Sequence, residues 1–377
     1  MLRNSYSYVN EIGSAGSISS RIIFGIVLIV FSVAGSLIAQ QPTPTPSSSV
    51  ASKTESPTVK KIKRWFELDT LAVSTRYRHI ATNVNINSAD VLQFQLQAKG
   101  HFKFDAKGKY SVYAGVYTGN AIDSGWGSTG WGTGKAVTNL YLKQLYFQAK
   151  PIKSIEFQFG GIAPNNGENT EVTGYDNDTY LMGERVSFRN PKKLFFDEVT
   201  LTNGHFGDLK RPSVFRRFKR LDESNYHQFL VRKKVNDNVS FSADYTFENG
   251  RDTLRQAVKF SIPKFRVFDL MRFENYQRVD PDHGYGFGVY GEKVLKKKLT
   301  LYTGFSRIDT LMTNGDRYPR GNRLYGGWNY KLSREFSFNG FWIQGIGPLP
   351  TAATPRTRFE AIFTVNLLEA LRRYKLY

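Results

Sequence analysis

Acidic side chains concentrate in one polar segment of the chain. Residues 164–181 read PNNGENTEVTGYDNDTYL and carry Glu168, Glu171, Asp176 and Asp178. The plainest interpretation is a set of solvated loop acids. Asp176 and Asp178, with Glu171 nearby, could instead bind Ca²⁺ through oxygen ligands. Two carboxylates in a polar loop are weak evidence for a cation site, so the sequence predicts no metal.

Basic side chains concentrate in a second polar segment, residues 206–224. Its cations, set among Phe206, Phe215 and Phe218, are Lys210, Arg211, Arg216, Arg217, Lys219 and Arg220. Basic residues interleaved with aromatic ones are one signature of nucleic-acid binding. Arginine also binds phosphate groups bidentately, outside any nucleic acid. The segment is therefore either a phosphate-binding loop or a solvated basic loop.

Catalytic chemistry finds little support in the remaining polar residues. The chain has no cysteine, which excludes disulfides, thiolate nucleophiles and thiolate metal ligands. Its five histidines are His79, His101, His205, His227 and His283. None lies in a recognisable nucleophile or metal-binding motif. The sequence predicts neither an enzyme nor a cofactor.

The elements that position these segments show a period of two. From Leu92 to Phe104 mostly apolar residues alternate with polar ones such as Gln93 and Lys103. Residues 239–248, 323–332 and 358–367 repeat the alternation. Such a pattern indicates β-strands with one apolar and one polar face. Residues 140–151, 194–202 and 265–274 alternate poorly, which indicates either bulges or misplaced strand boundaries.

Connections between these strands alternate between short and long. Short turns are expected at 105–109, 151–154, 190–193, 235–238, 263–264, 295–298 and 333–335. Longer linkers are expected at 81–89, 120–137, 164–181, 206–224, 249–252, 279–284, 310–321 and 345–355, of which 249–252 is the shortest. This asymmetry is typical of membrane barrels with short periplasmic turns and long extracellular loops. The predicted fold is an all-β, transmembrane, antiparallel up-and-down β-barrel of about 16 strands, within a range of about 14–18.

The N-terminal residues have the pattern of a secretory signal. Arg21 precedes an apolar stretch from Ile22 to Ala39 that ends in small residues. We expect cleavage after Ala39, although an uncleaved transmembrane anchor is the alternative. Residues 40–63 are rich in Pro, Thr and Ser and are expected to form a flexible periplasmic tether. The barrel is expected at residues 64–377, with a short C-terminal tail at 369–377.

Over residues 64–368 the chain resembles the bacterial outer-membrane porin superfamily of the sixteen-stranded type. The signal, the tether and the turn–loop alternation carry this resemblance, and no motif indicates a subfamily. One departure is the C-terminus, where Arg373 and Lys375 occupy positions that are apolar in the last strand of these proteins. The resemblance implies an outer-membrane location in a Gram-negative-type bacterium. Homotrimers are common among porins of this size.

The resemblance also implies that the third long loop, residues 164–181, folds into the lumen. Its acids would then face a basic wall of inward residues, for which the alternation indicates Arg76, Arg78, Lys99, Lys103, Arg255, Lys259, Arg323 and Arg358. Opposed charges across a constriction create a transverse field that sorts solutes. Trp126 and Trp131, in the glycine-rich segment GWGSTGWGTG, are expected to anchor the barrel at the membrane interface.

The expected function is a water-filled channel for passive diffusion of small hydrophilic solutes. A formal net charge of +20 favours anions among them. Outer-membrane lipid and lipopolysaccharide are the expected partners, the latter through the basic segment. Nucleic acid is not expected, because the basic residues are spread over many turns. The alternatives are transport of an acidic polysaccharide and a non-channel barrel with an enzymatic or structural role.

Overall fold

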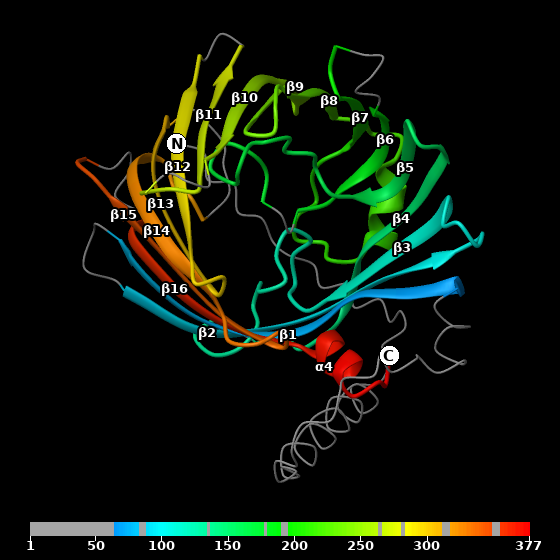
Figure 1. Cartoon of the computed structure of the whole chain (residues 1–377), viewed down its shortest axis with the longest axis horizontal. Coiled ribbons are helices and arrows are strands. Elements are labelled where there is room, and N and C mark those ends of the chain that lie inside the picture. Colours follow the sequence, from blue (N-terminus) through cyan, green and yellow to red (C-terminus); the bar gives the residue numbers. More distant parts are fainter. Residues whose placement is uncertain are drawn as a thin grey trace, which may run out of the picture. The chain divides into compact units, whose positions relative to one another are not determined.

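The structure, a computed structural model, describes residues 64–82, 88–133, 136–176, 179–189, 195–262, 266–279, 283–310, 317–348 and 355–377. The expected signal peptide and tether lie outside these residues. The described residues form one closed sheet of sixteen antiparallel strands, in which each strand pairs with its sequence neighbours and β1 pairs with β16 (Figure 1). The predicted up-and-down barrel is confirmed. No helix in the described part of the chain is long and apolar enough to span a membrane.

Strand bounds follow the predicted alternation of turns and loops. The strands are β1 (Phe66–Thr82), β2 (Ser88–Lys103), β3 (Tyr110–Tyr117), β4 (Tyr141–Ile152), β5 (Ile155–Ile162), β6 (Leu181–Arg189), β7 (Glu198–His205), β8 (Tyr226–Lys234), β9 (Val239–Glu248), β10 (Arg251–Ser261), β11 (Leu270–Arg278), β12 (Tyr285–Leu295), β13 (Leu299–Ile308), β14 (Gly321–Lys331), β15 (Phe336–Gly345) and β16 (Pro355–Asn366). We call the end with the β2–β3 turn the short-turn rim and the opposite end the long-loop rim. The two-residue turn at Asn249 and Gly250 is the tight exception on the long-loop rim.

The poorly alternating segments have two different causes. In β4 the pairing register shifts on both sides, near Gly115 of β3 and after Ala149, so a bulge disrupts the alternation. For residues 194–202 and 265–274 the expected boundaries are wrong. The strands begin instead at Glu198 and Leu270, and residues 195–197 belong to the preceding turn.

Polar and apolar side chains are distributed inside out relative to a soluble protein. On β2, Leu92 is 53% exposed on the outer face, whereas Gln93 is 3% exposed on the inner face. Phe229, Tyr245, Phe273 and other large apolar residues are likewise exposed on the outer face. An outer face of this kind requires an apolar surrounding, because a contiguous exposed apolar belt is unfavourable in water.

The glycine-rich segment completes the sheet where β3 is too short. β2 pairs with β3 only from Gln97 to Lys103, and beyond this Leu92 exchanges two backbone hydrogen bonds with Trp131 (3.1 and 2.8 Å). A Cβ on Gly130, where φ is +82°, would lie 2.1 Å from the carbonyl oxygen of Leu92. Glycine is therefore required for this close approach.

The C-terminal residues form a helix that covers the seam of the barrel. β16 pairs with β1 only from Ala72 onward, which leaves the first residues of β1 without a partner on that side. Helix α4 (Leu367–Arg373) begins with Asn366 as its N-cap and packs against β1. The backbone N–H of Leu68 donates to the hydroxyl of Tyr377 (2.5 Å). The tail therefore covers a strand edge that would otherwise be open.

Candidate functional site: the charged lumen and its inward loop

The acidic segment between β5 and β6 crosses the interior of the barrel. The carbonyl of Asn165 accepts from the side chain of Gln228 on β8 (2.8 Å). The N–H of Glu168 donates to Ser242 on β9 (2.7 Å), and the side chain of Asn169 donates to a β10 carbonyl (3.3 Å). We call residues 163–180 the inward loop. Its course inside the ring of strands is visible in Figure 1.

The far end of the inward loop is fixed by a carboxylate and an apolar anchor. Glu274 on β11 accepts from the N–H of Thr170 (2.6 Å), the hydroxyl of Thr173 (2.7 Å) and the hydroxyl of Thr170. Val172 is fully buried among residues of β11 and β13–β15 and the loop before β14, which are Tyr276, Ile308, Tyr318, Tyr325, Phe341 and Ile343. These apolar side chains pack together inside the barrel around Val172 of the inward loop.

Two acids of the inward loop, Glu168 and Glu171, lie near basic groups. Glu168 pairs with Lys259 (3.2 Å) and lies 3.7 Å from Arg232. Glu171 pairs with Arg317 (3.3 Å), which comes from the loop before β14. Asp176 lines the cavity of about 1190 Å³ that opens beside the inward loop, and Asp178 lies outside the described residues. Among the described residues no cluster suited to a metal ion is present.

Several residues expected in the basic wall are arginines that line the cavity beside the inward loop. Arg76 and Arg358 share the buried carboxylate of Glu360 (3.3 and 2.7 Å), and Arg255 pairs with buried Asp244 (3.3 Å). Arg78 lines the cavity with these arginines.

Three further residues of the expected wall have local partners. Lys103 pairs with Glu67 (2.6 Å) near the short-turn rim, and Lys99 lies over the ring of Tyr117 (5.6 Å). Arg323 donates to four backbone carbonyls around residues 319–320 and 355–356. Its charge therefore holds the ends of two loops, rather than facing the lumen space.

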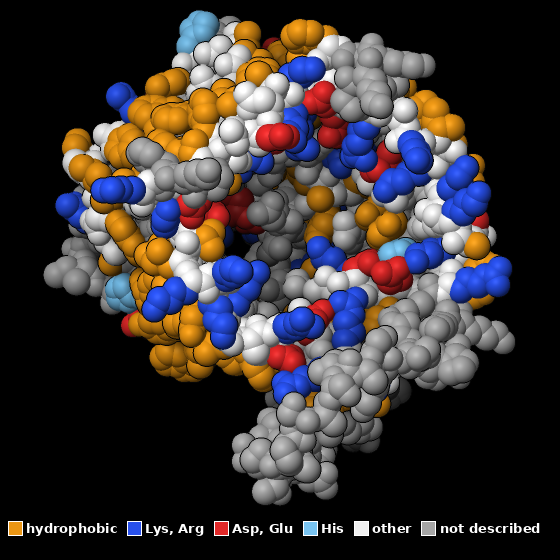
Figure 2. Space-filling model, in the orientation of Figure 1, with side chains coloured by type: hydrophobic (Ala, Val, Ile, Leu, Met, Phe, Trp, Pro, Cys, Tyr) orange, Lys and Arg blue, Asp and Glu red, His pale blue; other side chains and the backbone are white. Residues whose placement is uncertain are grey.

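A cavity of about 1190 Å³ opens beside the inward loop. Among the described residues its basic lining consists of arginines: Arg76, Arg78, Arg251, Arg255, Arg278, Arg317 and Arg358. The acids that line it are Asp123, Glu171, Asp176, Glu248 and Glu360. Figure 2 shows an opening at the centre of the molecule, with blue and red side chains gathered around it and orange ones on the outside. A solute in this space would meet both signs of charge, with cations in excess.

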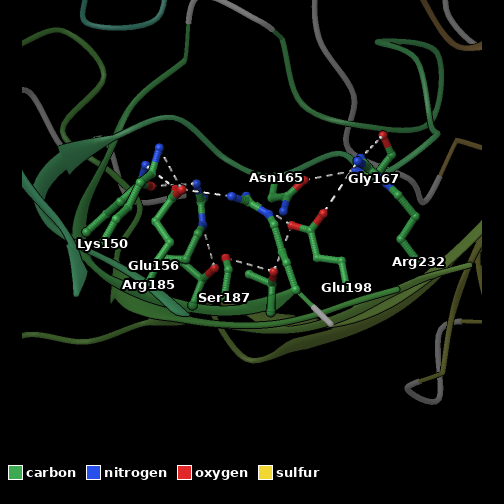
Figure 3. A network of polar contacts seen from close by, with 12 residues as sticks. Lys150, Glu156, Asn165, Gly167, Arg185, Ser187, Glu198 and Arg232 are labelled. Atoms are coloured by element: carbon green, nitrogen blue, oxygen red, sulfur yellow. Dashed lines mark hydrogen bonds and ion pairs between the residues drawn. The ribbon is translucent and has the colours of Figure 1, made fainter. Parts of the chain in front are cut away.

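A second charged network connects the inward loop to the wall near the short-turn rim (Figure 3). Glu156 on β5 pairs with Lys150 (3.1 Å) and Arg189 (2.7 Å). Arg232 reaches Glu198 (3.5 Å) and donates to the carbonyl of Gly167 (2.9 Å). A cavity of about 420 Å³ lies beside this network. The inward loop thus has charged spaces beside it towards both rims.

The basic segment 206–224 contains helix α3 (Val214–Arg217) and the short helix η1 (Phe218–Arg220). Lys210, Arg211, Arg216 and Lys219 are exposed, as expected for a basic loop. Arg220 instead pairs with Asp208 (3.1 Å) and Glu223 (2.5 Å).

Arg217 differs from the other cations of the segment. It is only 1% exposed, and burial lowers its pKa to about 10. Its two terminal guanidinium nitrogens have no hydrogen-bond partner in the described part of the chain. Treating it as an exposed member of the basic loop is therefore wrong, because α3 turns this one side chain inward.

The tryptophans of the glycine-rich segment also separate. Trp131 is 72% exposed, which is compatible with an interfacial position. Trp126 is buried and lines the cavity, with the guanidinium of Arg76 4.5 Å from its ring centre. The interfacial expectation is therefore wrong for Trp126, which is part of the lumen wall.

The acids of the barrel wall are the main residues that the sequence reasoning did not select. Glu360, Asp244 and Glu274 fix the positions of the arginines and of the inward loop. Asp244 and Glu360 lie at inward positions of strands whose alternation is clear in the sequence, so the periodicity that selected the arginines could have selected them. Glu274 lies in the poorly alternating segment 265–274, where no such signal is visible. Arg317 had no such signal, because it lies in a loop.

Comparisons with known proteins agree on the architecture. No family model and no curated protein sequence matches the chain. Among solved structures, a triple mutant of the Rhodopseudomonas blastica porin matches with a TM-score of 0.52 and 12% identity, over 80% of this chain and 99% of that one. Salmonella typhi OmpF in complex with daunomycin matches with a TM-score of 0.52 and 10% identity, over 80% and 98%. The chain has the porin fold. At this identity the likeness is one of fold.

Proposed function

We propose that this chain is an outer-membrane porin through which small hydrophilic solutes diffuse passively, with a preference for anions. The observation that carries the proposal is the inside-out barrel, with an apolar outer face and a charged cavity of about 1190 Å³. The porin fold supports the same conclusion. An apolar outer belt suits lipid, and a polar interior suits water and ions.

The preference for anions rests on the lining of the cavity. Among the described residues that line it, arginines outnumber acids, and a low-dielectric wall focuses the field of the charges it holds. We propose that the carboxylates of Glu168, Glu171, Asp176 and Asp178 and the opposing arginines form the constriction. The pairing of Arg76 and Arg358 around Glu360 supports this proposal, because it holds two cations at the cavity wall.

The proposed location and partners follow from the same reasoning. We expect residues 1–39 to be removed as a signal peptide and residues 40–63 to form a periplasmic tether to the barrel. The exposed cations Lys210, Arg211, Arg216 and Lys219 are proposed to bind lipopolysaccharide phosphates at the long-loop rim. A homotrimer remains the proposed assembly by analogy of fold.

Single-channel conductance in a planar bilayer, with the reversal potential under a salt gradient, tests the function. We expect stepwise openings and a reversal potential on the anion side. The double variant Arg76→Gln with Arg358→Gln should move the reversal potential toward cations. Lys210→Gln, an exposed cation of the basic loop outside the cavity lining, is the matched control. A folded barrel that gives no conductance would contradict the open channel, and an unchanged reversal potential would contradict the proposed arginine wall.

A further inference from the structure

Three neighbouring connections of the short-turn rim carry exposed cations that have no acidic partner among the described residues. They join β10 to β11, β12 to β13 and β14 to β15, which are consecutive in the closed sheet. Two acids of this sector are engaged with other groups, since Asp269 pairs with Lys293 (2.8 Å) and Glu335 with Arg373 (3.2 Å). We call the exposed cations of these connections the basic turn patch: Arg266, Lys296, Lys297, Lys298 and Arg334.

The turn between β12 and β13 presents its lysines at a conformational cost. Lys296 and Lys297 have φ values of +51° and +60°, and the N–H of Lys298 donates to the carbonyl of Leu295 (3.3 Å). A turn with positive φ at both central residues favours Asn and Gly, because a larger side chain is strained there. Strain of this kind is typical of residues that serve a function beyond the fold. Here it keeps three consecutive cations at the tip of a hairpin.

Each of the three connections also exposes a large aliphatic side chain beside its cations. These side chains are Val267, Leu295 and Leu332. On the strands below the tips, Leu301 and Tyr330 are exposed on the outer face of the barrel. The basic turn patch therefore lies directly beyond the end of the apolar outer face, at the level where hydrocarbon gives way to lipid headgroups.

We propose that the basic turn patch binds the headgroups of anionic phospholipids in the leaflet at the short-turn rim. Ammonium and guanidinium groups hold phosphate through charge-assisted hydrogen bonds, and the aliphatic side chains beside them enter the boundary between headgroups and acyl chains. A soluble polyanion could use the cations, but it would gain little from exposed aliphatic side chains, so the combination favours a lipid. The inference rests on the proposed membrane placement of the barrel, and not on the passage of solutes through it.

The expected consequence is a preference for anionic over zwitterionic lipid. Attraction of clustered cations to an anionic surface grows with the number of charges near it. The preference should therefore weaken when lysines of the patch are removed. It should also weaken as the salt concentration rises, because exposed charges are screened by salt.

Native mass spectrometry of the detergent-solubilised barrel tests this preference. The full chain is titrated with phosphatidylglycerol or with phosphatidylcholine of the same acyl chains. We expect the wild type to bind phosphatidylglycerol at least tenfold more tightly. The triple variant Lys296→Gln, Lys297→Gln and Lys298→Gln should reduce this preference at least threefold. Equal binding of the two lipids by the wild type would overturn the proposal.

The matched control removes the same formal charge from the same rim. It is the triple variant Lys150→Gln, Lys233→Gln and Lys234→Gln, whose lysines pair with Glu156 (3.1 Å), Asp197 (3.6 Å) and Asp237 (2.7 Å). Because these cations are already compensated by acids, we expect the lipid preference to stay within twofold of the wild type. Equal losses in the two triple variants would show that only the total charge matters, and would overturn the assignment to the patch.

A second variant separates a lipid from a soluble polyanion. Leu295→Ser with Leu332→Ser removes two exposed aliphatic side chains and keeps every cation. We expect the affinity for phosphatidylglycerol to fall at least threefold and the affinity for inorganic polyphosphate to stay unchanged. An unchanged affinity for phosphatidylglycerol, with tighter binding of polyphosphate, would identify a soluble polyanion instead and overturn the lipid. An intact lipid preference in a barrel that gives no conductance would contradict the proposed channel alone and support this inference.

Discussion

Removal of the Glu274 carboxylate is the most direct test of how the inward loop is held. Glu274→Ala deletes the acceptor for the N–H of Thr170 and the hydroxyls of Thr170 and Thr173. Hydrogen bonds to charged groups contribute about 1.5–3 kcal/mol each. The donors can regain water and the contributions are not additive, so we expect a net loss of roughly 3 kcal/mol for docking of the loop. At about 1.4 kcal/mol per factor of ten, the docked-to-released ratio falls about 100-fold.

The assay is single-channel recording of the wild-type and variant proteins in the same lipid. We expect a steady conductance level for the wild type. In Glu274→Ala we expect transitions to a higher level, because a released loop no longer narrows the lumen. Val172 remains as an anchor, so the lower level should persist for part of the time.

Glu292→Ala is the matched control for the change in lumen charge. Glu292 also points inward on the neighbouring strand β12, and its side chain accepts a hydrogen bond from the hydroxyl of Tyr290 (2.7 Å), not from the inward loop. Both variants should shift ion selectivity in the same direction, and only Glu274→Ala should show the higher level. Identical recordings from the two variants would refute the idea that Glu274 holds the loop.

Three further predictions concern the rims. Hydrogen bonds from the hydroxyl of Ser333 and then from Arg373 lower the pKa of Glu335 from its ordinary value of 4.5. The contact of Glu335 with Arg373 therefore stabilises α4 at higher pH, and this stabilisation is lost as the pH falls through the lowered pKa. The NMR signals of α4 should shift over that pH range in the wild type and should not shift in Glu335→Gln. Gly130→Val should lower the free energy of unfolding in urea by more than Gly250→Val. The backbone at Gly250 has a similar positive φ but free space around it, so that substitution should cost only about 1–2 kcal/mol. Equal losses would contradict the close approach of Gly130 to β2. Arg217→Met should raise the free energy of unfolding by about 1–3 kcal/mol, because it removes a buried guanidinium whose terminal nitrogens lack hydrogen bonds, and a loss of stability would show that this charge is satisfied.

The strands and the order of turns and loops were largely predictable from the sequence. The alternation that begins at Leu92 and Gln93 assigns each residue to a face, because successive side chains of a strand point in opposite directions. The loop expected at 164–181 and the turn expected at 190–193 leave room for one strand between them, and the structure has β6 there, at Leu181–Arg189. Local alternation failed where the pairing shifts, as in β4, since a bulge depends on the neighbouring strand.

The partners of the charged residues were decided only by the tertiary structure. Glu171 and Arg317 are 146 positions apart, and the closed sheet and two loops bring them to 3.3 Å. Arg217 and Arg216 are adjacent in one basic run, and only the packing of α3 buries the first and exposes the second. Outside the bulged strand β4 and the misplaced strand boundaries, the sequence by itself determined which face a strand residue occupies, because that depends on local geometry. Barrel closure decided which charges meet, because it joins positions that are distant in the chain.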